Sequence, residues 1–289
     1  MILGKNDKIF DILIYTIIAI VVFLCIMPFI HILALSFSSS GAVIAQKVTL
    51  FPVGFNFEAY VRVFTDQTMI HSLILTIGIT IAFTILGMFL IICAAYPLTK
   101  KRLKGRKIMS MLCIFTLYFS GGLIPNYLLI SKLNMMNTLW SLILPLAFSA
   151  FNMIILKNFF VAIPESLEES AHLDGCSDVG ILLKIVLPLS TPALATLALF
   201  YAVGRWNTFQ DALFYITKPT LYPLQLKLNM IVSASASSES FGESGNGAQL
   251  VPEVLKSASV IFATVPILII YPFLQKYFVS GVMVGAVKG

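Results

Sequence analysis

Residues 168–188, EESAHLDGCSDVGILLKIVLP, form a polar and partly charged island between two strongly apolar stretches of the chain. Ionised side chains at the centre of a bilayer raise the free energy by several kcal/mol each, so such an island does not lie in lipid. If its flanks enter a membrane, the island must be a loop outside it. We therefore expect a helical membrane protein with one long, structured loop.

The loop itself is expected to fold as a short helix, a sharp turn and a second helix. Ser166-Leu-Glu-Glu169 fits a capping box, in which Ser166 is the N-cap and Glu169 stands at N3. Gly175 is expected to end the first helix, over 167–174, because glycine adopts the left-handed conformation without a steric penalty. The second helix is expected to begin near Ser177.

The composition of the whole chain indicates a membrane protein. The chain has 289 residues, of which 58% are hydrophobic and only 11% charged, and its mean hydropathy is +0.95. A soluble domain carries about 25% charged residues. Only helices and closed barrels satisfy their backbone groups in lipid, and the apolar runs lack the alternation of barrel strands. The predicted fold is all-α and polytopic.

Six apolar runs are long enough to cross the hydrocarbon core, which requires about 20 helical residues. They are 12–36, 70–96, 108–130, 138–161, 191–216 and 257–279, and together they form a single transmembrane domain over 1–289. The first run exceeds the apolar core of a signal peptide, which has roughly 7–15 residues, so we interpret it as an uncleaved span.

The orientation follows from lysine and arginine. The loop 97–107, PLTKKRLKGRK, carries six basic residues, whereas the loop 131–137 carries only Lys132. Short basic loops stay in the cytoplasm. Six spans then place both termini and the loop 164–190 in the cytoplasm as well.

The basic balance does not indicate a nucleic-acid partner. The net charge is +6, but the basic residues concentrate in the loop 97–107, as membrane orientation requires. The four cysteines are Cys25, Cys93, Cys113 and Cys176, and no pair has the spacing of metal ligands or of a disulfide framework. We expect neither a nucleic-acid partner nor a metal site.

Several blocks, in order, carry a resemblance to a known family over nearly the whole chain. They are VTLFPVGFNFEAY (48–60), AAYPLTKKRLKGRK (94–107), GGLIPNYLLISKLNMMNTLWSLILP (121–145), KNFFVAIPESLEESAHLDG (157–175), WNTFQDALFYI (206–216), LYPLQL (221–226) and YFVSGVMVGAVKG (277–289). The chain resembles the carbohydrate ABC importer permeases of the maltose-type, binding-protein-dependent family. Within it, the resemblance is to the branch for complex oligosaccharides and uronate-containing sugars.

The loop 164–190 resembles the EAA loop of these permeases, where a permease meets its ATPase. Glu169-Ser-Ala171 is followed by Gly175 and then by Ile185-x-Leu187-Pro188 at the family spacing. The chain departs from the pattern at Ser170, where alanine is usual, and at His172, where arginine is common. The ATPase-coupling residues implied are Glu168, Glu169, Ser170, Ala171, Asp174 and Gly175. Without the resemblance, an ordinary cytosolic connector would explain the loop equally well.

The resemblance implies a bacterial cell-membrane complex. Its other members are a second, homologous permease, two copies of a cytoplasmic ABC ATPase and an extracellular sugar-binding protein. The chain contains no G-x-x-x-x-G-K-[ST] phosphate loop. It is therefore not expected to be an enzyme or to hold a cofactor, and ATP and magnesium would be bound by the ATPase.

Polar residues inside spans indicate a substrate path. Sugar binding requires an aromatic face together with amide or carboxyl groups, and the candidates are Tyr118, Asn126, Asn152, Trp206, Asn207 and Asp211. Three of them have a structural alternative. Asp211 can pair with Arg205 inside the membrane, Asn152 can form an interhelical hydrogen bond, and Trp206 can belong to an interfacial aromatic belt.

Two other classes of protein fit less well. An intramembrane serine protease requires a histidine base beside its nucleophile, and His31, His71 and His172 accompany no G-x-S-x-G motif. An autonomous secondary transporter or channel usually requires an inverted repeat and a coupling charge near the midplane. Arg205 and Asp211 are the candidates for that charge, but the loop 164–190 would then have no role.

Overall fold

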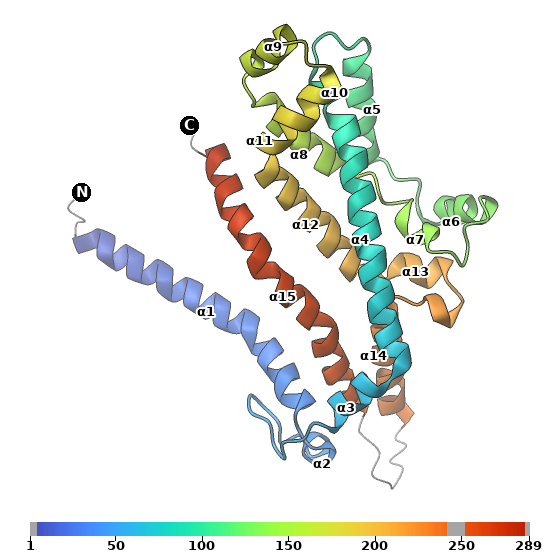
Figure 1. Ribbon diagram of the computed structural model, residues 1–289. Helices are drawn as coiled ribbons and strands as arrows, with labels where there is room; N and C mark the ends of the chain where they lie inside the picture. Colours follow the sequence, from blue (N-terminus) through green and yellow to red (C-terminus); the bar gives the residue numbers. More distant parts are fainter. Residues whose placement is uncertain (1–4, 242–251, 287–289) are drawn as a thin grey trace. The chain divides into compact units, whose positions relative to one another are not determined.

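The computed structural model describes residues 5–241 and 252–286, and every regular element in these ranges is helical (Figure 1). The chain divides into two compact units. Unit 1 comprises Met1–Ile70 and Leu228–Val265, and unit 2 comprises His71–Lys227 and Pro266–Gly289. The expected all-α architecture is confirmed for the described residues.

Unit 1 contains α1 (Lys5–Ser36), α2 (Ser40–Ile44) and α3 (Glu58–Thr65). Three helices begin in one unit and end in the other, namely α4 (Gln67–Ala95), α14 (Leu224–Phe241) and α15 (Pro252–Ala286). Unit 2 contains η1 (Pro97–Thr99), α5 (Arg106–Tyr118), α6 (Leu123–Lys132), α7 (Trp140–Ile143), α8 (Ala150–Val161), α9 (Glu165–Leu173), α10 (Asp178–Ile181), η2 (Leu182–Val186), α11 (Leu187–Leu189), α12 (Thr191–Asn207), α13 (Gln210–Tyr215) and η3 (Pro219–Leu221).

Among the residues that the structure describes, three helices are long and apolar enough to cross a membrane. The segments are Phe10–Ser36, Gln67–Thr99 and Pro252–Ile270, with 27, 33 and 19 residues. They coincide with the first, second and last of the six expected spans. Each reaches the length that about 30 Å of hydrocarbon requires.

The other three expected spans are not single helices, which corrects the sequence-based boundaries. The span expected at 108–130 consists of α5 and α6, which are bent by 112° at Phe119–Gly122. Gly122 has a φ of +86°, which interrupts the helix. With 13 residues, α5 is about 20 Å long, which is too short to cross alone.

The same correction applies to 138–161 and 191–216. The first contains α7 and α8, separated by a non-helical stretch that includes Pro145, and the second contains α12 and α13, separated at Thr208 and Phe209. Apolar composition alone does not reveal such breaks. Within the described residues, three bent pairs raise the number of candidate spans to six if each pair counts as one: α5 with α6, Ala150–Val161 with Glu165–Leu173, and Asp178–Leu189 with Thr191–Asn207.

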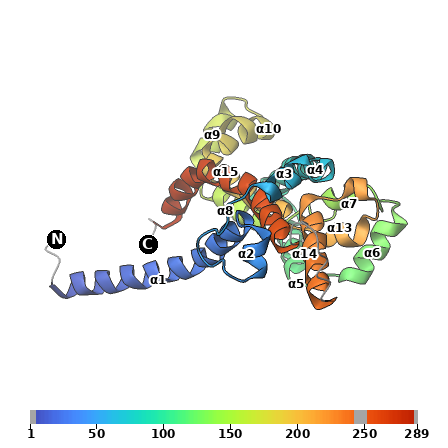
Figure 2. The same cartoon turned by 90° about the horizontal axis from the view of Figure 1, so that it is seen from below.

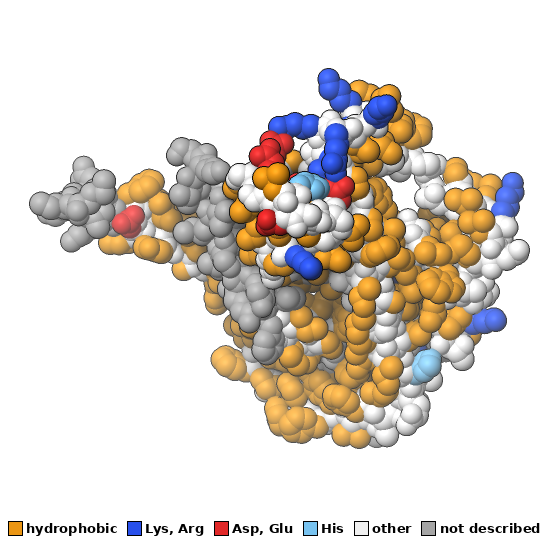
Figure 3. Space-filling view, turned by 45° about the horizontal axis from the view of Figure 1, so that its top comes forward, with side chains coloured by type: hydrophobic (Ala, Val, Ile, Leu, Met, Phe, Trp, Pro, Cys, Tyr) orange, Lys and Arg blue, Asp and Glu red, His pale blue; other side chains and the backbone are white. Residues whose placement is uncertain are grey.

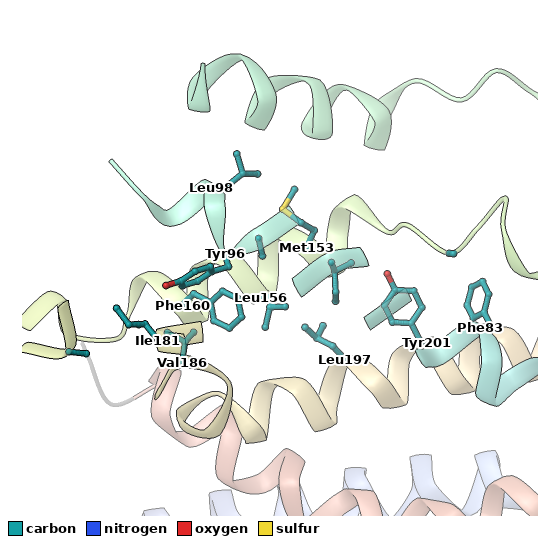
Figure 4. Close-up of a cluster of buried hydrophobic side chains, with 14 residues drawn as sticks. Phe83, Tyr96, Leu98, Met153, Leu156, Phe160, Ile181, Val186, Leu197 and Tyr201 are labelled. Carbon is teal, nitrogen blue, oxygen red and sulfur yellow. The ribbon is translucent and has the colours of Figure 1, made fainter. Parts of the chain in front are cut away.

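The main core of unit 2 joins helices that are distant in sequence (Figure 4). Leu156 of α8, Ile181 of α10 and Leu197 of α12 have no exposed surface and belong to one cluster with residues of α4. Because α10 follows α9 along the chain, this cluster links the loop helices to α4, α8 and α12.

A second cluster holds the short helices together. Ile143 of α7 packs with Ala212 of α13 and with Ile216, and α6, α7 and α13 lie side by side in Figure 1 and Figure 2. The Asn137 side chain accepts hydrogen bonds from the backbone nitrogens of Thr217, at 2.6 Å, and Lys218, at 3.1 Å. Side-chain contacts, rather than a continuous helix, thus hold together the segments expected as spans at 138–161 and 191–216.

Gly87 of α4 faces the ring of Tyr201 on α12. A Cβ atom added there would lie 2.5 Å from Cε1 of Tyr201 on α12. The Tyr201 ring cannot easily move, because it is 4% exposed and its hydroxyl accepts a hydrogen bond from the Ser149 backbone nitrogen at 3.1 Å.

We therefore expect Gly87→Ala to destabilise the protein by about 1–3 kcal/mol, the usual effect of overpacking. Gly78→Ala on the same helix is the control, since no atom lies within 4 Å of the added methyl group. Alanine is about 1 kcal/mol more favourable than glycine in a helix, so this control should be neutral or stabilising. Thermal midpoints of the purified variants in detergent test the prediction, and equal midpoints would contradict it.

Candidate functional site

The first loop helix, α9, begins one residue after an N-cap proline. Pro164 is the N-cap, with ψ at 129°, and it makes no side-chain capping bond. The capping box predicted at Ser166 and Glu169 is therefore wrong. Proline supplies an extended backbone before the helix, so helical geometry starts at Glu165 and Ser166 falls in the first turn. Glu165 and Glu168 lie in that turn, where the positive end of the helix dipole favours carboxylates.

The end of α9 is a Schellman motif centred on Gly175. Gly175 has a φ of +80°, and its backbone nitrogen donates to the His172 carbonyl at 3.0 Å. The Cys176 nitrogen donates to the Ala171 carbonyl at 2.9 Å. These two bonds satisfy the last carbonyls of the helix. The prediction that Gly175 stops this helix is confirmed.

The second loop helix, α10, leads directly toward α12. Ser177 is its N-cap, and its Oγ accepts a hydrogen bond from the Gly180 nitrogen at 3.2 Å, as the sequence predicted. The helix widens into the π-helical segment η2, where the Leu187 nitrogen donates to the Leu182 carbonyl. Pro188, which has no backbone N–H, stands just after this widened turn.

The basic loop 97–107 lies against α9, and its best-buried contact is the ion pair of Lys100 with Glu168. The Lys100 Nζ bonds the Glu168 carboxylate, and the two side chains are 17% and 18% exposed. Nζ also lies 4.2 Å from the centre of the Tyr96 ring. Partial burial reduces screening by water, so this pair contributes more than a surface pair does.

The next two cations of the loop also bind acidic side chains. Lys101 pairs with Glu165 at 2.9 Å, and Arg102 bonds both carboxylate oxygens of Asp178. His172 adds a contact of 3.4 Å to Asp178. Figure 3 shows these basic and acidic side chains gathered on the part of unit 2 that carries α9 and α10. From the sequence, this loop was used only to orient the chain, but the loop also binds both loop helices. The ion pairs Lys100–Glu168, Lys101–Glu165 and Arg102–Asp178 are called the clamp below.

The two sides of α9 differ in what they contact. Ala171 is 9% exposed and belongs to the main core of unit 2, and Glu168 is held by Lys100. These two predicted coupling residues therefore face their own chain. The other four, Glu169, Ser170, Asp174 and Gly175, are exposed.

Leu173 was not predicted as a site residue, although 90% of its surface is exposed at the end of α9. It is not among the coupling residues that the resemblance implied, which is why the motif missed it. It is a large apolar side chain at a helix end whose neighbours His172 and Asp174 are polar and also exposed.

Among the predicted path residues, Asp211 forms the ion pair foreseen as its alternative. Arg205 and Asp211 have 2% and 9% exposed side chains, and Arg205 Nη2 lies 3.1 Å from Asp211 Oδ1. Arg205 also donates to the carbonyls of Leu142, at 3.0 Å, and Thr208, at 3.3 Å. The pair therefore ties the break between α12 and α13 to α7.

Two further path candidates are buried. Asn152 of α8 is 7% exposed, and its side chain lies near the Tyr201 hydroxyl of α12. This burial next to another helix is compatible with the interhelical role given as its alternative. Trp206 is 5% exposed. Both side chains contribute to the packing of α8 and α12 with their surroundings.

The remaining path candidates have free surface. Tyr118 at the end of α5 is 87% exposed, and Asn126 and Asn207 are exposed as well. The Asn207 amide nitrogen donates to the Val203 carbonyl of its own helix at 2.9 Å. In residues 5–241 and 252–286, no group of three or more His, Cys, Asp or Glu residues could hold a metal ion.

Comparison with known proteins places this geometry in context. Residues 92–284 match the family described as "Binding-protein-dependent transport system inner membrane component". The chain is similar to the polygalacturonan/rhamnogalacturonan transport system permease protein YtcP of Bacillus subtilis, with 43% identity over 98% of this chain and 100% of that protein.

Solved structures share the fold. One is a bacterial ABC transporter involved in the import of the acidic polysaccharide alginate, with a TM-score of 0.87 and 33% identity, covering 95% of this chain and 98% of the other. Another is a bacterial alginate ABC transporter in complex with an alginate pentasaccharide-bound periplasmic protein. Its TM-score is 0.57 at 17% identity, covering 93% and 94% of the two chains.

The burial of Lys100 and Glu168 predicts a measurable coupling energy. In a double-mutant cycle with Lys100→Met and Glu168→Gln, we expect a coupling of about 1 kcal/mol or more, from thermal or denaturant unfolding. The matched control is Lys101 with Glu165, whose side chains are 77% and 66% exposed. Exposed pairs typically give about 0.2–1 kcal/mol, so this cycle should give less. A larger value for the exposed pair would contradict the assignment.

For the buried pair of Arg205 and Asp211, we expect that removing one partner destabilises the protein more than removing both. Asp211→Leu leaves an unpaired buried guanidinium and should destabilise the protein by about 3–5 kcal/mol. The double variant Arg205→Met, Asp211→Leu removes both charges and should recover most of that loss. Midpoints of unfolding measure both variants. A double variant no more stable than the single one would show that the pair does not act as a unit.

Proposed function

The chain belongs to the family of binding-protein-dependent transport system inner membrane components, as a permease subunit of an ABC sugar importer, and we propose that its substrate is an acidic oligosaccharide. Support comes from two similar proteins, one named for polygalacturonan and rhamnogalacturonan and the other described with the acidic polysaccharide alginate. Polygalacturonan and alginate are both polymers of uronic acids. The proposed substrate is therefore a short chain of sugars that carries carboxylates.

We further propose that the chain crosses the membrane six times as one domain, with both termini and α9 in the cytoplasm. The three long helices and the three bent pairs are compatible with that number if each pair counts as one span. Two of these pairs join α8 to α9 and the segment Asp178–Leu189 to α12, so α8 and α12 would be their parts in the membrane. The basic loop 97–107 supports the orientation, because short basic loops stay in the cytoplasm. Its contacts with α9 and α10 bring both loop helices to the same side.

The proposal that α9 couples the permease to the ATPase is supported by one observation: α9 is held by ion pairs on one side and exposed on the other. One side of the helix is bound to the loop after α4 by Lys100 and Glu168, while Glu169, Ser170 and Leu173 remain exposed. We propose that these exposed residues contact the ATPase. A displacement of α9 would then be passed to α4 through the ion pairs and to α12 through α10 and α11, which follow it along the chain.

The proposed complex contains this subunit, a second permease, two copies of an ATPase and an extracellular sugar-binding protein. The family description, which names binding-protein-dependent transport, supports the last of these. ATP and magnesium are assigned to the ATPase. This chain would supply half of the translocation path and the surface that the ATPase moves.

Within that path, the six predicted residues separate into two groups. We propose that Tyr118, Asn126 and Asn207, whose side chains are exposed, contact the sugar through an aromatic face and amide groups. The buried side chains of Asn152, Trp206 and Asp211 would position the helices behind that surface. Substitution of an exposed path residue should lower uptake without lowering the amount of assembled complex.

Reconstitution tests the function. The complex is purified through a tag on this chain, placed in proteoliposomes, and supplied with labelled galacturonate or alginate oligosaccharides, the binding protein and internal ATP. We expect uptake that requires both ATP and the binding protein. If the chain purified alone and took up sugar under an ion gradient without ATP, the autonomous-transporter alternative would replace this proposal.

A single exposed residue tests the docking side of α9. Leu173→Asp should leave stability within about 0.5 kcal/mol, because surface substitutions rarely do more, yet it should abolish the stimulation of ATP hydrolysis by the loaded binding protein. Leu133→Asp is the control, at a leucine with 57% exposure in the loop after α6. Normal stimulation in Leu173→Asp would remove the docking role.

A further inference from the structure

A cavity of about 480 Å³ opens in unit 2 between the end of α4, the loop after it and α10. Its walls are mainly apolar and include Ile92, Leu103, Val179 and Leu182, with the thiol of Cys93 beside them. Val179 is 64% exposed, and Cys93 is also exposed. The cavity is therefore open to molecules that approach from outside the unit.

The rim of the cavity is basic. Lys100, Arg102 and Lys104 line it together with one acid, Asp178. Glu168 binds Lys100, and Asp178 binds Arg102. Lys104 forms no ion pair within residues 5–241 and 252–286. The cavity thus combines an apolar interior with an uncompensated positive charge at its mouth.

The chemistry that complements these surfaces is an amphiphile with a hydrocarbon chain and an anionic head. A sugar would leave the apolar walls without a matching surface, and a small inorganic anion would use only the rim. The cavity lies where α4 meets the basic loop, which is the level at which anionic headgroups gather beside juxtamembrane lysines. We propose that it binds one anionic phospholipid of the cytoplasmic leaflet, with the head at Lys104 and an acyl chain against Ile92 and Leu182.

This proposal rests on the cytoplasmic orientation given under Proposed function, and it adds a consequence for coupling. The walls and rim include Lys100, Arg102 and Asp178, which belong to the ion-pair clamp on α9 and α10. A bound lipid would therefore occupy the space beside the clamp and support it.

The native thiol of Cys93 provides the test. The delipidated complex in detergent is treated with N-ethylmaleimide, and modification of Cys93 is followed by peptide mass spectrometry. We expect phosphatidylglycerol to slow the reaction, phosphatidylcholine to slow it much less, and inorganic phosphate to have no effect. Lys104→Gln should weaken the protection by phosphatidylglycerol about fivefold in apparent affinity, while Lys107→Gln, in the same loop but outside the cavity lining, should retain it.

Three results would overturn the proposal: no protection by any lipid, equal protection by both lipids, or protection by inorganic phosphate alone. Equal protection by the two lipids would remove the role of charge, and protection by phosphate would indicate a free-anion site. Each result leaves the importer function intact if ATP-dependent uptake persists, so the failure of this inference can be distinguished from the failure of the proposed function.

Discussion

The ion pair between Lys100 and Glu168 joins the segment after α4 to α9, and both side chains are largely shielded from water. The other contacts of the loop are arranged around it, because Lys101 and Arg102 bind the neighbouring acids Glu165 and Asp178. Without this clamp, α9 would be attached mainly through Ala171 and by its connections along the chain. With the clamp, one side of a nine-residue helix is held while its other side stays exposed.

The same organisation supports the proposed role of the loop in coupling. The Schellman motif at Gly175 fixes the end of α9, and Ser177 starts α10 directly after it. Ile181 then enters the core cluster that contains residues of α4, α8 and α12. A force applied at the exposed residues of α9 therefore reaches helices in the core by two routes, through the ion pairs and through the packed core.

Sequence reasoning succeeded where a local pattern has one physical solution. The turn that ends α9 required a residue in the left-handed conformation, which Gly175 supplies, and the apolar run 70–96 predicted a long helix, which the structure has at Gln67–Ala95. It missed two local backbone features, because Pro164 rather than Ser166 is the N-cap of α9, and the positive φ of Gly122 interrupts the span expected at 108–130. The pairing of Lys100 with Glu168 spans 68 residues of sequence, so neither periodicity nor spacing could reveal it. The exposure of Leu173 depends on which side of α9 that pairing turns inward.

The central claim is that the clamp on α9 transmits the motion of the ATPase, and the number of ATP molecules hydrolysed per sugar imported tests it most directly. The measurement uses proteoliposomes that contain the whole complex and either Glu168→Lys, Lys100→Glu or both changes together. The account predicts a raised ratio for each single variant and a return toward the wild-type ratio when the charges are exchanged. Wild-type ratios in both single variants would contradict it.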